Sequence, residues 1–500
     1  MDVCTTKDGL VRGHRPAPDI VAFLGIPYAA APFGANRFRE PRPVRAWEGV
    51  RECRTFGPVA PQSARLPGAP SWSPGDEDIL TLNVWAPASG TDPIPVLVWI
   101  HGGAYTFGSS AQPDFDGTAL AGAGLVVVTF NYRLGFEGFG HIPPGSGPPY
   151  PENRGLLDQI AALRWVRQNI AAFGGDPANV TVAGQSSGAA SAACLMTMDR
   201  ARGLFHRVIA HSVVGPCYSM ELAAETTRRV AAAAGIPATS THLTSATPQA
   251  LVAAADRVVD GYRQDPGSGP RHYNPVIYGP VIDGDILPSD PLAATADGAS
   301  AAVDLLVSHT AQEYWLMDAV GSSPKVTTDE QLAQFSNDFR LPDGLVPGYR
   351  KLMPVAPVLD IYLAIFGDLL FSEYTNRLAE RHAQAGGRAF TSRFARHRRG
   401  IEGVVRAWHC ADIPFAFGNL TLKSVEFLIG GPPNAADHEL SQRMMGAWAG
   451  FALTGDPGWS SLNGPTTSPH VWDTADTPAG ATNAAARALW RHADFSPLRP

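Results

Sequence analysis

Five compact apolar runs, each of strand length, constrain the fold of this chain most strongly. They lie at residues 95–100, 125–131, 179–184, 206–212 and 303–309. Runs that are apolar on both faces are typical of strands in a parallel sheet that helices cover on both sides. We therefore expect these runs to form a largely parallel central sheet.

The segment between the second and third runs has helical periodicity. Its apolar residues recur at Leu156, Ile160, Leu163, Val166 and Ile170. This spacing places one apolar stripe against the sheet, and Gly174 and Gly175 are expected to end the helix. Strands that alternate with helices predict an open α/β sheet.

Composition excludes several classes of protein. Hydrophobic residues make up 45% and charged residues 17% of the chain, which is typical of a globular protein. The formal net charge is −7, and no long Lys/Arg block is present, so we expect no nucleic-acid partner. The most basic stretch, 393–399, is interpreted as a solvated helix face. No apolar run approaches the roughly 20 residues that span a bilayer, so no membrane partner is expected.

The cysteines and the chain organisation indicate a single cytoplasmic domain. The five cysteines are scattered and form no Cys-x-x-Cys pair, so neither a disulfide framework nor a zinc site is expected. The first residues lack the features of an export signal. Stretches rich in proline and glycine at 60–75 and 141–151 are expected to be surface loops rather than linkers, so residues 1–500 are predicted to form one domain.

A Gly-x-Ser-x-Gly motif occurs at Gly184, Ser186 and Gly188. In a glycine-rich chain such a motif alone can be an ordinary flexible loop. Here it lies between a β-branched run and a string of small residues that indicates a helix. A tight turn from strand to helix holds its serine in a strained conformation, and small flanking residues leave room for it. Ser186 is therefore a candidate nucleophile at the carboxyl edge of the sheet.

A serine nucleophile needs donors for the oxyanion that its attack creates. The strand at 95–100 leads directly into His-Gly-Gly, and glycines there let backbone N–H groups approach a substrate closely. We assign Gly102, Gly103 and Ser187 as oxyanion donors. The alternative for the first two is a plain glycine turn.

The acid and the base are expected after the serine, on loops that follow strands. Glu313 lies just past the carboxyl end of the 303–309 run, whereas Asp304 lies at its opposite end, so Glu313 is the better candidate. Spacing does not choose among the downstream histidines. These are His382, His397, His409, His438, His470 and His492.

Several long segments, in order along the chain, resemble the type-B carboxylesterases, the cholinesterase-like group, and most of all the bacterial para-nitrobenzyl esterases. The matching segments are 23–38, 46–62, 77–85, 101–108, 131–139, 153–188, 280–288, 407–417 and 448–459. The resemblance implies an α/β-hydrolase fold with loop and helical insertions that form a lid over the active site. It also implies that His409 is the base, from a His-x-x-acidic-x-Pro-Phe segment, and it supports Glu313, which follows Gln312 in the family's acidic loop.

Four positions near the expected site differ from, or add to, the family pattern. Gln185 stands where glutamate is usual, which removes a buried charge, and Ser187 replaces the usual alanine. Ile79 replaces a cysteine of secreted relatives, which agrees with an intracellular location. Ser212 matches a serine common near the family's active site, although a buried hydroxyl bonded to backbone is an equally good interpretation.

From this constellation of residues we expect ester hydrolysis through an acyl-enzyme, with no metal or organic cofactor, and we expect short-to-medium acyl chains in the substrate. The same residues also suit an amidase, a lactonase, a carbamate hydrolase or a transacylase, because a triad does not define the leaving group. A non-catalytic binding module of this superfamily is disfavoured, since such relatives typically lose the serine. Loops 60–75, 105–115, 213–222 and 314–322 are expected to wall the pocket. No pattern in the sequence predicts an oligomeric state.

Overall fold

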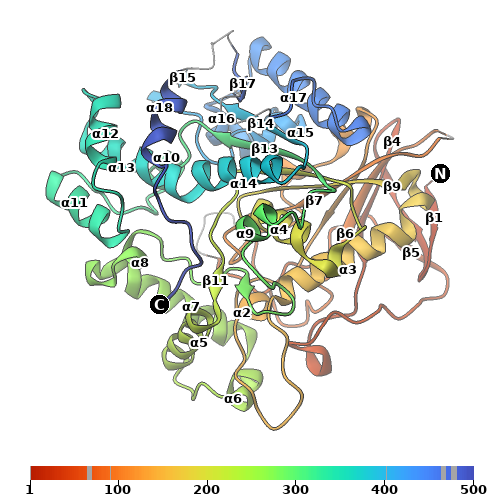
Figure 1. Ribbon diagram of the computed structural model, residues 1–500. Helices are drawn as coiled ribbons and strands as arrows, with labels where there is room; N and C mark the ends of the chain where they lie inside the picture. Colours follow the sequence, from red (N-terminus) through yellow and green to blue (C-terminus); the bar gives the residue numbers. More distant parts are fainter. Residues whose placement is uncertain (1, 65–69, 91, 401–402, 463–468, 475–480) are drawn as a thin grey trace.

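A ten-stranded sheet forms the centre of the computed structural model, counted over the residues that the structure describes, 2–64, 70–90, 92–400, 403–462, 469–474 and 481–500 (Figure 1). Its strands, in spatial order, are β17 (His470–Trp472), β14 (Ala389–Phe394), β13 (Asp304–Thr310), β10 (Arg207–His211), β9 (Gly175–Gln185), β7 (Ile94–Ile100), β8 (Val126–Phe130), β6 (Thr81–Pro87), β4 (Ile20–Pro27) and β3 (His14–Ala17).

The sheet is parallel from β17 to β8 and antiparallel from β8 through β6 and β4 to β3. All five predicted runs are strands of its parallel part, which confirms the predicted mostly parallel sheet. The parallel register matters for function because it brings the carboxyl ends of β7, β9, β10 and β13 to one edge.

Alternating side chains of the strands pack against two separate helical layers. On β7, Val96 and Val98 join the core that also contains residues of α3 (Arg154–Asn169), α4 (Ser187–Thr197) and α14 (Glu373–Gln384). Leu97 and Trp99 point to the other face and join residues of α15 (Ile413–Phe417) and α17 (Ala435–Thr454). Each layer therefore buries one face of the sheet, as expected for strands apolar on both sides.

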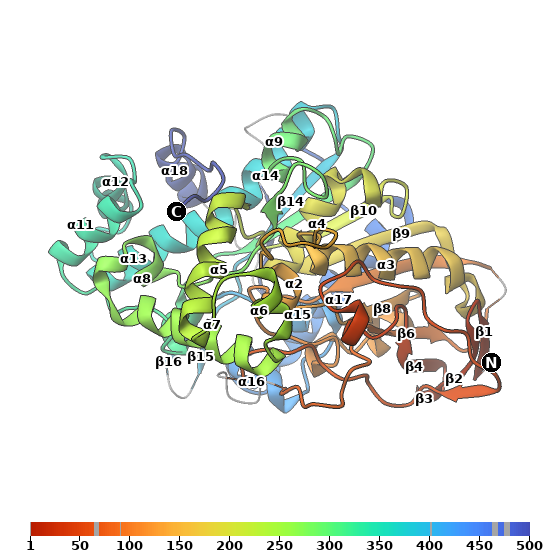
Figure 2. The ribbon, with the colours of Figure 1, turned by 90° about the horizontal axis from the view of Figure 1, so that it is seen from below.

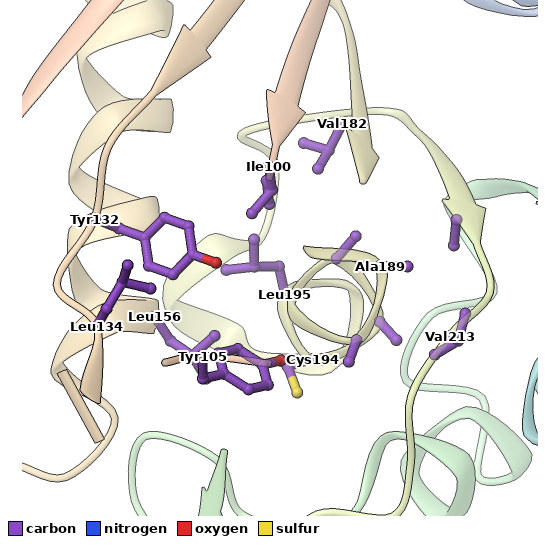
Figure 3. Packing of buried hydrophobic residues seen from close by; sticks show 14 of the residues in the cluster. Ile100, Tyr105, Tyr132, Leu134, Leu156, Val182, Ala189, Cys194, Leu195 and Val213 are labelled. Atoms are coloured by element: carbon purple, nitrogen blue, oxygen red, sulfur yellow. The ribbon is translucent and has the colours of Figure 1, made fainter. Parts of the chain in front are cut away.

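The helix α4 fits against the sheet because its inward residues are small. Figure 3 shows this helix end-on, with Ala189, Cys194 and Leu195 among the buried residues around it. Ile100 and Val182 from the adjacent strands belong to the same cluster. Full burial of an aliphatic side chain contributes about 1.5–3 kcal/mol, so this packing fixes the helix that follows Ser186.

The periodic helix predicted over 155–175 is present but ends earlier. The α-helix α3 ends at Asn169, and a 3-10 turn covers Ile170–Phe173. Gly174 then adopts a left-handed conformation with φ 84°, which confirms it as the stop signal. Gly175 is already the first residue of β9.

The basic stretch 393–399 is not a helix face, so that prediction is wrong. Arg393 belongs to β14, and β15 (Arg398–Gly400) begins a few residues later. Arg396 is buried and pairs with Asp437 of α17, with an N–O distance of 2.8 Å. A buried ion partner, which charge patterning does not reveal, explains why this basic residue faces inward.

The remaining elements surround the sheet. The strands are β1 (Val3–Thr6), β2 (Gly9–Arg12), β5 (Val50–Glu52), β11 (Tyr218–Ser219), β12 (Val281–Ile282) and β16 (Gly403–Val405). The helices are α1 (Thr118–Gly122), α2 (Gly135–Phe139), α5 (Met220–Ala234), α6 (Ser240–Ser245), α7 (Pro248–Gln264), α8 (Pro270–Tyr273), α9 (Pro291–Ala296), α10 (Trp315–Ala319), α11 (Asp329–Asp338), α12 (Leu345–Leu352), α13 (Val358–Gly367), α16 (Glu426–Ile429) and α18 (Ala481–Leu489).

Insertions gather at one end of the molecule. The helices α5, α7 and α8 lie beside the C-terminus, whereas the N-terminus and β1 lie at the opposite end (Figures 1 and 2). Residues 141–151 contain neither helix nor strand, as predicted for a surface loop. Of the helices within the described residues, none is both long and apolar enough to cross a bilayer.

Candidate active site

Ser186 lies on a sharp turn between β9 and α4. Its backbone has φ 57° and ψ −124°, a strained conformation for a residue with a side chain. The turn is held by hydrogen bonds from Ser186 N to the His211 carbonyl (2.9 Å) and from Ala190 N to the Ser186 carbonyl (3.0 Å). The geometry is that of the turn predicted for the motif, and Ser186 lines a large cavity at the carboxyl edge of the sheet.

The two motif glycines leave no space for a side chain. A Cβ at Gly184 would lie 2.5 Å from the carbonyl carbon of Gly188, and one at Gly188 would collide with the carbonyl oxygen of Ile100. Strand, turn and helix therefore approach one another as closely as the backbone permits. This close approach is the physical reason for the Gly-x-Ser-x-Gly pattern.

Glu313 and His409 form a buried pair. His409 Nδ1 lies 2.6 Å from Glu313 Oε2, and the His409 backbone N–H donates to the Glu313 carbonyl at 3.1 Å. The other carboxylate oxygen accepts from Ser212 Oγ at 2.6 Å and from Thr310 N at 2.7 Å. Ser212 is thus bound to Glu313 through its hydroxyl, and the backbone-bonded alternative is wrong.

The surroundings of the pair determine its ionisation. Burial raises the pKa of Glu313, but the hydrogen bonds from His409, Ser212 and Thr310 outweigh burial and hold that pKa below its usual value. Burial lowers the pKa of His409, but the adjacent Cys410 side chain and the Glu313 carboxylate raise it above its ordinary value. Glu313 is therefore an anion that orients the ring and favours its protonated form.

The free ring nitrogen of His409 faces Gln185. The side-chain nitrogen of Gln185 lies 3.0 Å from His409 Nε2, and the ring of Phe371 packs on the imidazole with centroids 4.2 Å apart. Ser186 lines the same cavity as His409, and within the described part of the chain its hydroxyl makes no hydrogen bond. The structure thus brings Ser186 and His409 to one cavity, Glu313 is bound to the other ring nitrogen of His409, and Gln185 contacts Nε2.

The glycine loop after β7 lies next to the serine. Gly103 has φ 115°, and a Cβ there would collide with the Phe107 carbonyl. A Cβ at Gly102 would lie 3.2 Å from Ser186 Cβ. Ser187 is the first residue of α4, so its N–H is one of the unsatisfied donors at a helix start. In the described residues the N–H groups of Gly102, Gly103 and Ser187 donate to no acceptor, and all three residues line the cavity.

The cavity has a volume of about 1910 Å³. Its lining includes parts of the predicted walls 105–115, 213–222 and 314–322, but no described residue of 60–75. The cavity also has wall segments that were not predicted, including 262–280, 338–340, 369–374, 427–428 and 494–500.

A profile of the carboxylesterase family matches residues 1–484. The chain belongs to this family. A para-nitrobenzyl esterase of Bacillus subtilis (strain 168) is 34% identical over 473 residues, 93% of this carboxylesterase and 92% of that relative. A fumonisin B1 esterase of Sphingopyxis macrogoltabida is 34% identical over 466 residues, 90% and 82% of the two chains.

Solved structures support the same assignment. The crystal structure of a Geobacillus stearothermophilus carboxylesterase, determined at pH 6.2, superimposes with a TM-score of 0.82 and 35% identity, and the match covers 98% of this chain and 100% of the other. The structure of a thermophilic pNB esterase superimposes with a TM-score of 0.81 and 32% identity, and the match covers 95% of this chain and 96% of the other. The resemblance and the α/β-hydrolase fold are confirmed, and the carboxylesterase hydrolyses esters as a serine hydrolase.

A second buried histidine–acid pair supports the site, and sequence reasoning missed it. His211 Nδ1 lies 2.6 Å from Asp412 Oδ2, and both side chains are inaccessible to solvent. The carbonyl of His211 accepts the Ser186 N–H, and Asp412 follows His409 by three residues. The pair therefore links the end of β10, which accepts the Ser186 N–H, to the loop that carries His409. The sequence signal that could have indicated this pair is Asp412, the acidic residue of the 407–417 segment.

The other candidates of the sequence analysis lie outside the site. Asp304 pairs with Arg388 at the opposite end of β13. His382 is buried against Ser300, and His470 stacks on Trp459. His397, His438 and His492 are exposed. Within the described residues, no group of three or more His, Cys, Asp or Glu side chains could hold a metal ion.

Proposed function

We propose that this carboxylesterase acts through Ser186 as nucleophile, His409 as base and Glu313 as the group that orients the base. The observation that carries the proposal is the buried 2.6 Å contact between Glu313 and His409 Nδ1, because His409 lines the same cavity as a serine on a strained turn. With its Nδ1 proton donated to Glu313, the neutral ring presents the Nε2 lone pair. That lone pair takes the proton of Ser186 as the hydroxyl attacks an ester carbonyl.

The oxyanion is stabilised by the N–H groups of Gly102, Gly103 and Ser187. The local geometry supports this assignment, because all three N–H groups lack an acceptor in the described structure and the two glycines bring the backbone next to Ser186. Donors preorganised for the developing charge are worth several kcal/mol in such a site. His409 then protonates the leaving alcohol, and water hydrolyses the acyl-enzyme with His409 again as base.

The substrate is an ester of a short-to-medium acyl chain with room for a bulky alcohol group. The cavity volume of about 1910 Å³ exceeds the roughly 300–1,000 Å³ of most ligand pockets. The lining of the cavity includes aromatic side chains, among them Phe107, Phe371 and Tyr374. The same residues could also act on amides, lactones, carbamates and alcohol acceptors. Measuring the rates with each of these compounds separates the possible activities.

The whole chain is proposed to be one catalytic domain in the cytoplasm. Segments from Gly102 to Pro500 line one cavity, which supports a single domain. All five cysteine thiols are free, which supports a reducing compartment. The net charge of −7 supports a small-molecule ester rather than a nucleic acid as partner. Fractionation of the source cells tests the location.

Ser186→Ala tests the triad. We expect kcat for para-nitrophenyl butyrate to fall about 10⁴- to 10⁶-fold, because no other group supplies the acyl bond. A fluorophosphonate probe should label the parent protein at Ser186 and leave the variant unlabelled, as seen by intact mass. Ser110→Ala, a buried serine that does not line the cavity, serves as the matched control. Near-normal hydrolysis by the folded Ser186→Ala variant would overturn the assignment.

A further inference from the structure

Gln185 contacts the reactive nitrogen of the base. It is the last residue of β9, directly before Ser186, and only 5% of its surface is exposed. Its side-chain nitrogen lies 3.0 Å from His409 Nε2, the atom that must accept the serine proton. The contact joins residues 224 positions apart. Among the described residues, Gln185 is the hydrogen-bond partner of this nitrogen, whereas Glu313 binds Nδ1.

The same amide also lies against the glycine loop. A Cβ on Gly102 would lie 2.9 Å from the side-chain oxygen of Gln185 and 2.9 Å from its carbonyl oxygen. The side chain of Gln185 therefore fills the space beside Gly102 and spans from the oxyanion loop to the base. Its nitrogen is the amide atom that meets the imidazole, and its oxygen lies on the side of Gly102.

An amide at this place affects the base differently from a carboxylate. In the observed orientation the amide N–H donates to the Nε2 lone pair, which requires a neutral ring with its proton on Nδ1. If the ring gains a second proton, a rotated amide presents its oxygen instead. A carboxylate has no hydrogen-bond donor, so it stabilises only the protonated form of the ring. Gln185 thus supports the neutral, basic form of His409.

The other groups packed on His409 determine how much negative charge surrounds its ring. Glu313 contacts Nδ1 from the loop after β13, and Cys410 directly follows His409 in the chain. Phe371, from the π-helical turn Asp368–Ser372, covers the ring with an apolar face. Glu313 is the one carboxylate in hydrogen-bond contact with the ring among the described residues. A second carboxylate at position 185 would place the ring between two negative charges.

We propose that Gln185 is a positioning residue, an inference that rests on the proposed function. Its neutral amide holds His409 through Nε2 in the free enzyme. The base therefore stays active to lower pH than it would with a carboxylate at position 185. During the reaction His409 exchanges this partner for the Ser186 hydroxyl. The amide forms no covalent bond and gains or loses no proton. Its effect on catalysis passes entirely through the imidazole.

Two substitutions of similar shape test the proposal, with para-nitrophenyl butyrate, a neutral ester, as substrate. Gln185→Glu should move the midpoint of the acidic limb of kcat/KM upward by about 1–2 pH units, because an adjacent carboxylate favours the imidazolium. Gln185→Met removes the hydrogen bond without adding charge, so it should lower kcat while moving the midpoint less than Gln185→Glu does. Gln168→Glu, the same change on the exposed side of α3, should leave the midpoint unchanged.

An NMR measurement separates failure of this inference from failure of the proposed function. The Nδ1 proton that His409 shares with Glu313 should give a strongly downfield resonance, whose titration reports the ring without any turnover. If Ser186→Ala stays active, the proposed function fails, while the downfield titration still tests Gln185. If Ser186→Ala is inactive and Gln185→Glu titrates at the same pH as the parent protein in both measurements, the inference about Gln185 is overturned. Equal loss of activity in Gln185→Glu and Gln185→Met without any shift would also overturn it, because a structural role alone predicts that result.

Discussion

The floor and the walls of the cavity are built in different ways. The floor comes from the carboxyl ends of parallel strands and from α4, and its candidate residues Ser186, Glu313 and His409 are buried, with backbone hydrogen bonds at Ser186 and His409. The walls come from insertions and the C-terminal segment, and many of their residues, such as Arg263 and Arg499, are exposed. A rigid floor fixes the reaction, while variable walls select the substrate. Substitutions in the floor should therefore change kcat for every ester, and those in the walls should change preference among esters.

Glu313→Gln should produce one of the largest effects. An amide keeps the shape but cannot hold the Nδ1 proton of His409 as the carboxylate does, so kcat should fall about 10³- to 10⁴-fold. The loss should be equal for short and bulky esters, and steady-state kinetics with both measures it. Glu330→Gln on α11 is the exposed control. A loss confined to one substrate would show that Glu313 belongs with the walls.

Gly103→Ala should disrupt the floor of the cavity by displacing the backbone of the glycine loop. The added Cβ would collide with the Phe107 carbonyl at a residue with φ 115°, so the loop must move and displace an oxyanion donor. We expect kcat to fall about 10²- to 10³-fold with both esters.

Gly122→Ala is the matched control for that substitution, because a Cβ there meets no atom within 4 Å. Thermal melting of both variants separates an effect on folding from one on kcat. An undiminished kcat in folded Gly103→Ala would remove this loop from the proposed oxyanion site.

The pH dependence should reflect the floor as well. His409 must be neutral to accept a proton, and Cys410 and Glu313 raise its pKa above the ordinary value of about 6.5, against the effect of burial. Because the pKa is raised, kcat/KM should increase with pH through a midpoint above 6.5. Rates from pH 5 to 9 with a neutral ester give that midpoint. A midpoint below 6.5 would mean that burial dominates over the two neighbours.

Most of the floor could be predicted from the sequence because its signals are local. Apolar runs marked the strands, the spacing of Gly184 and Gly188 marked the turn, and the place of Glu313 after a strand distinguished it from Asp304. His409 gave no such signal, because its loop has no periodicity, and it was assigned through the family resemblance alone.

Contacts between distant segments were not predictable. The links from Gln185 to His409 and from His211 to Asp412 join residues more than 200 positions apart, and they depend on how strands and loops pack. Arg396 was expected in solvent because charged residues usually are exposed, yet Asp437 pairs with it in the core. The prediction of the cavity walls was incomplete for the same reason, since no sequence pattern places the C-terminal segment at the cavity.

Leu498→Ala should give the smallest effect and the sharpest contrast with the floor. Leu498 lines the cavity and is half-buried against Tyr218, and its backbone is fixed by hydrogen bonds to Cys217 and Ser219 of 2.8 and 2.9 Å. The substitution therefore trims the wall without moving it. A lost apolar contact changes kcat/KM for a bulky-alcohol ester by about 3- to 10-fold, while a short ester that remains near Ser186 should be unaffected. Leu453→Ala, an exposed leucine on α17, is the matched control. Equal changes for both esters would mean that the C-terminal segment supports the floor, and the division between a rigid reaction site and a selective wall would then have to be drawn elsewhere.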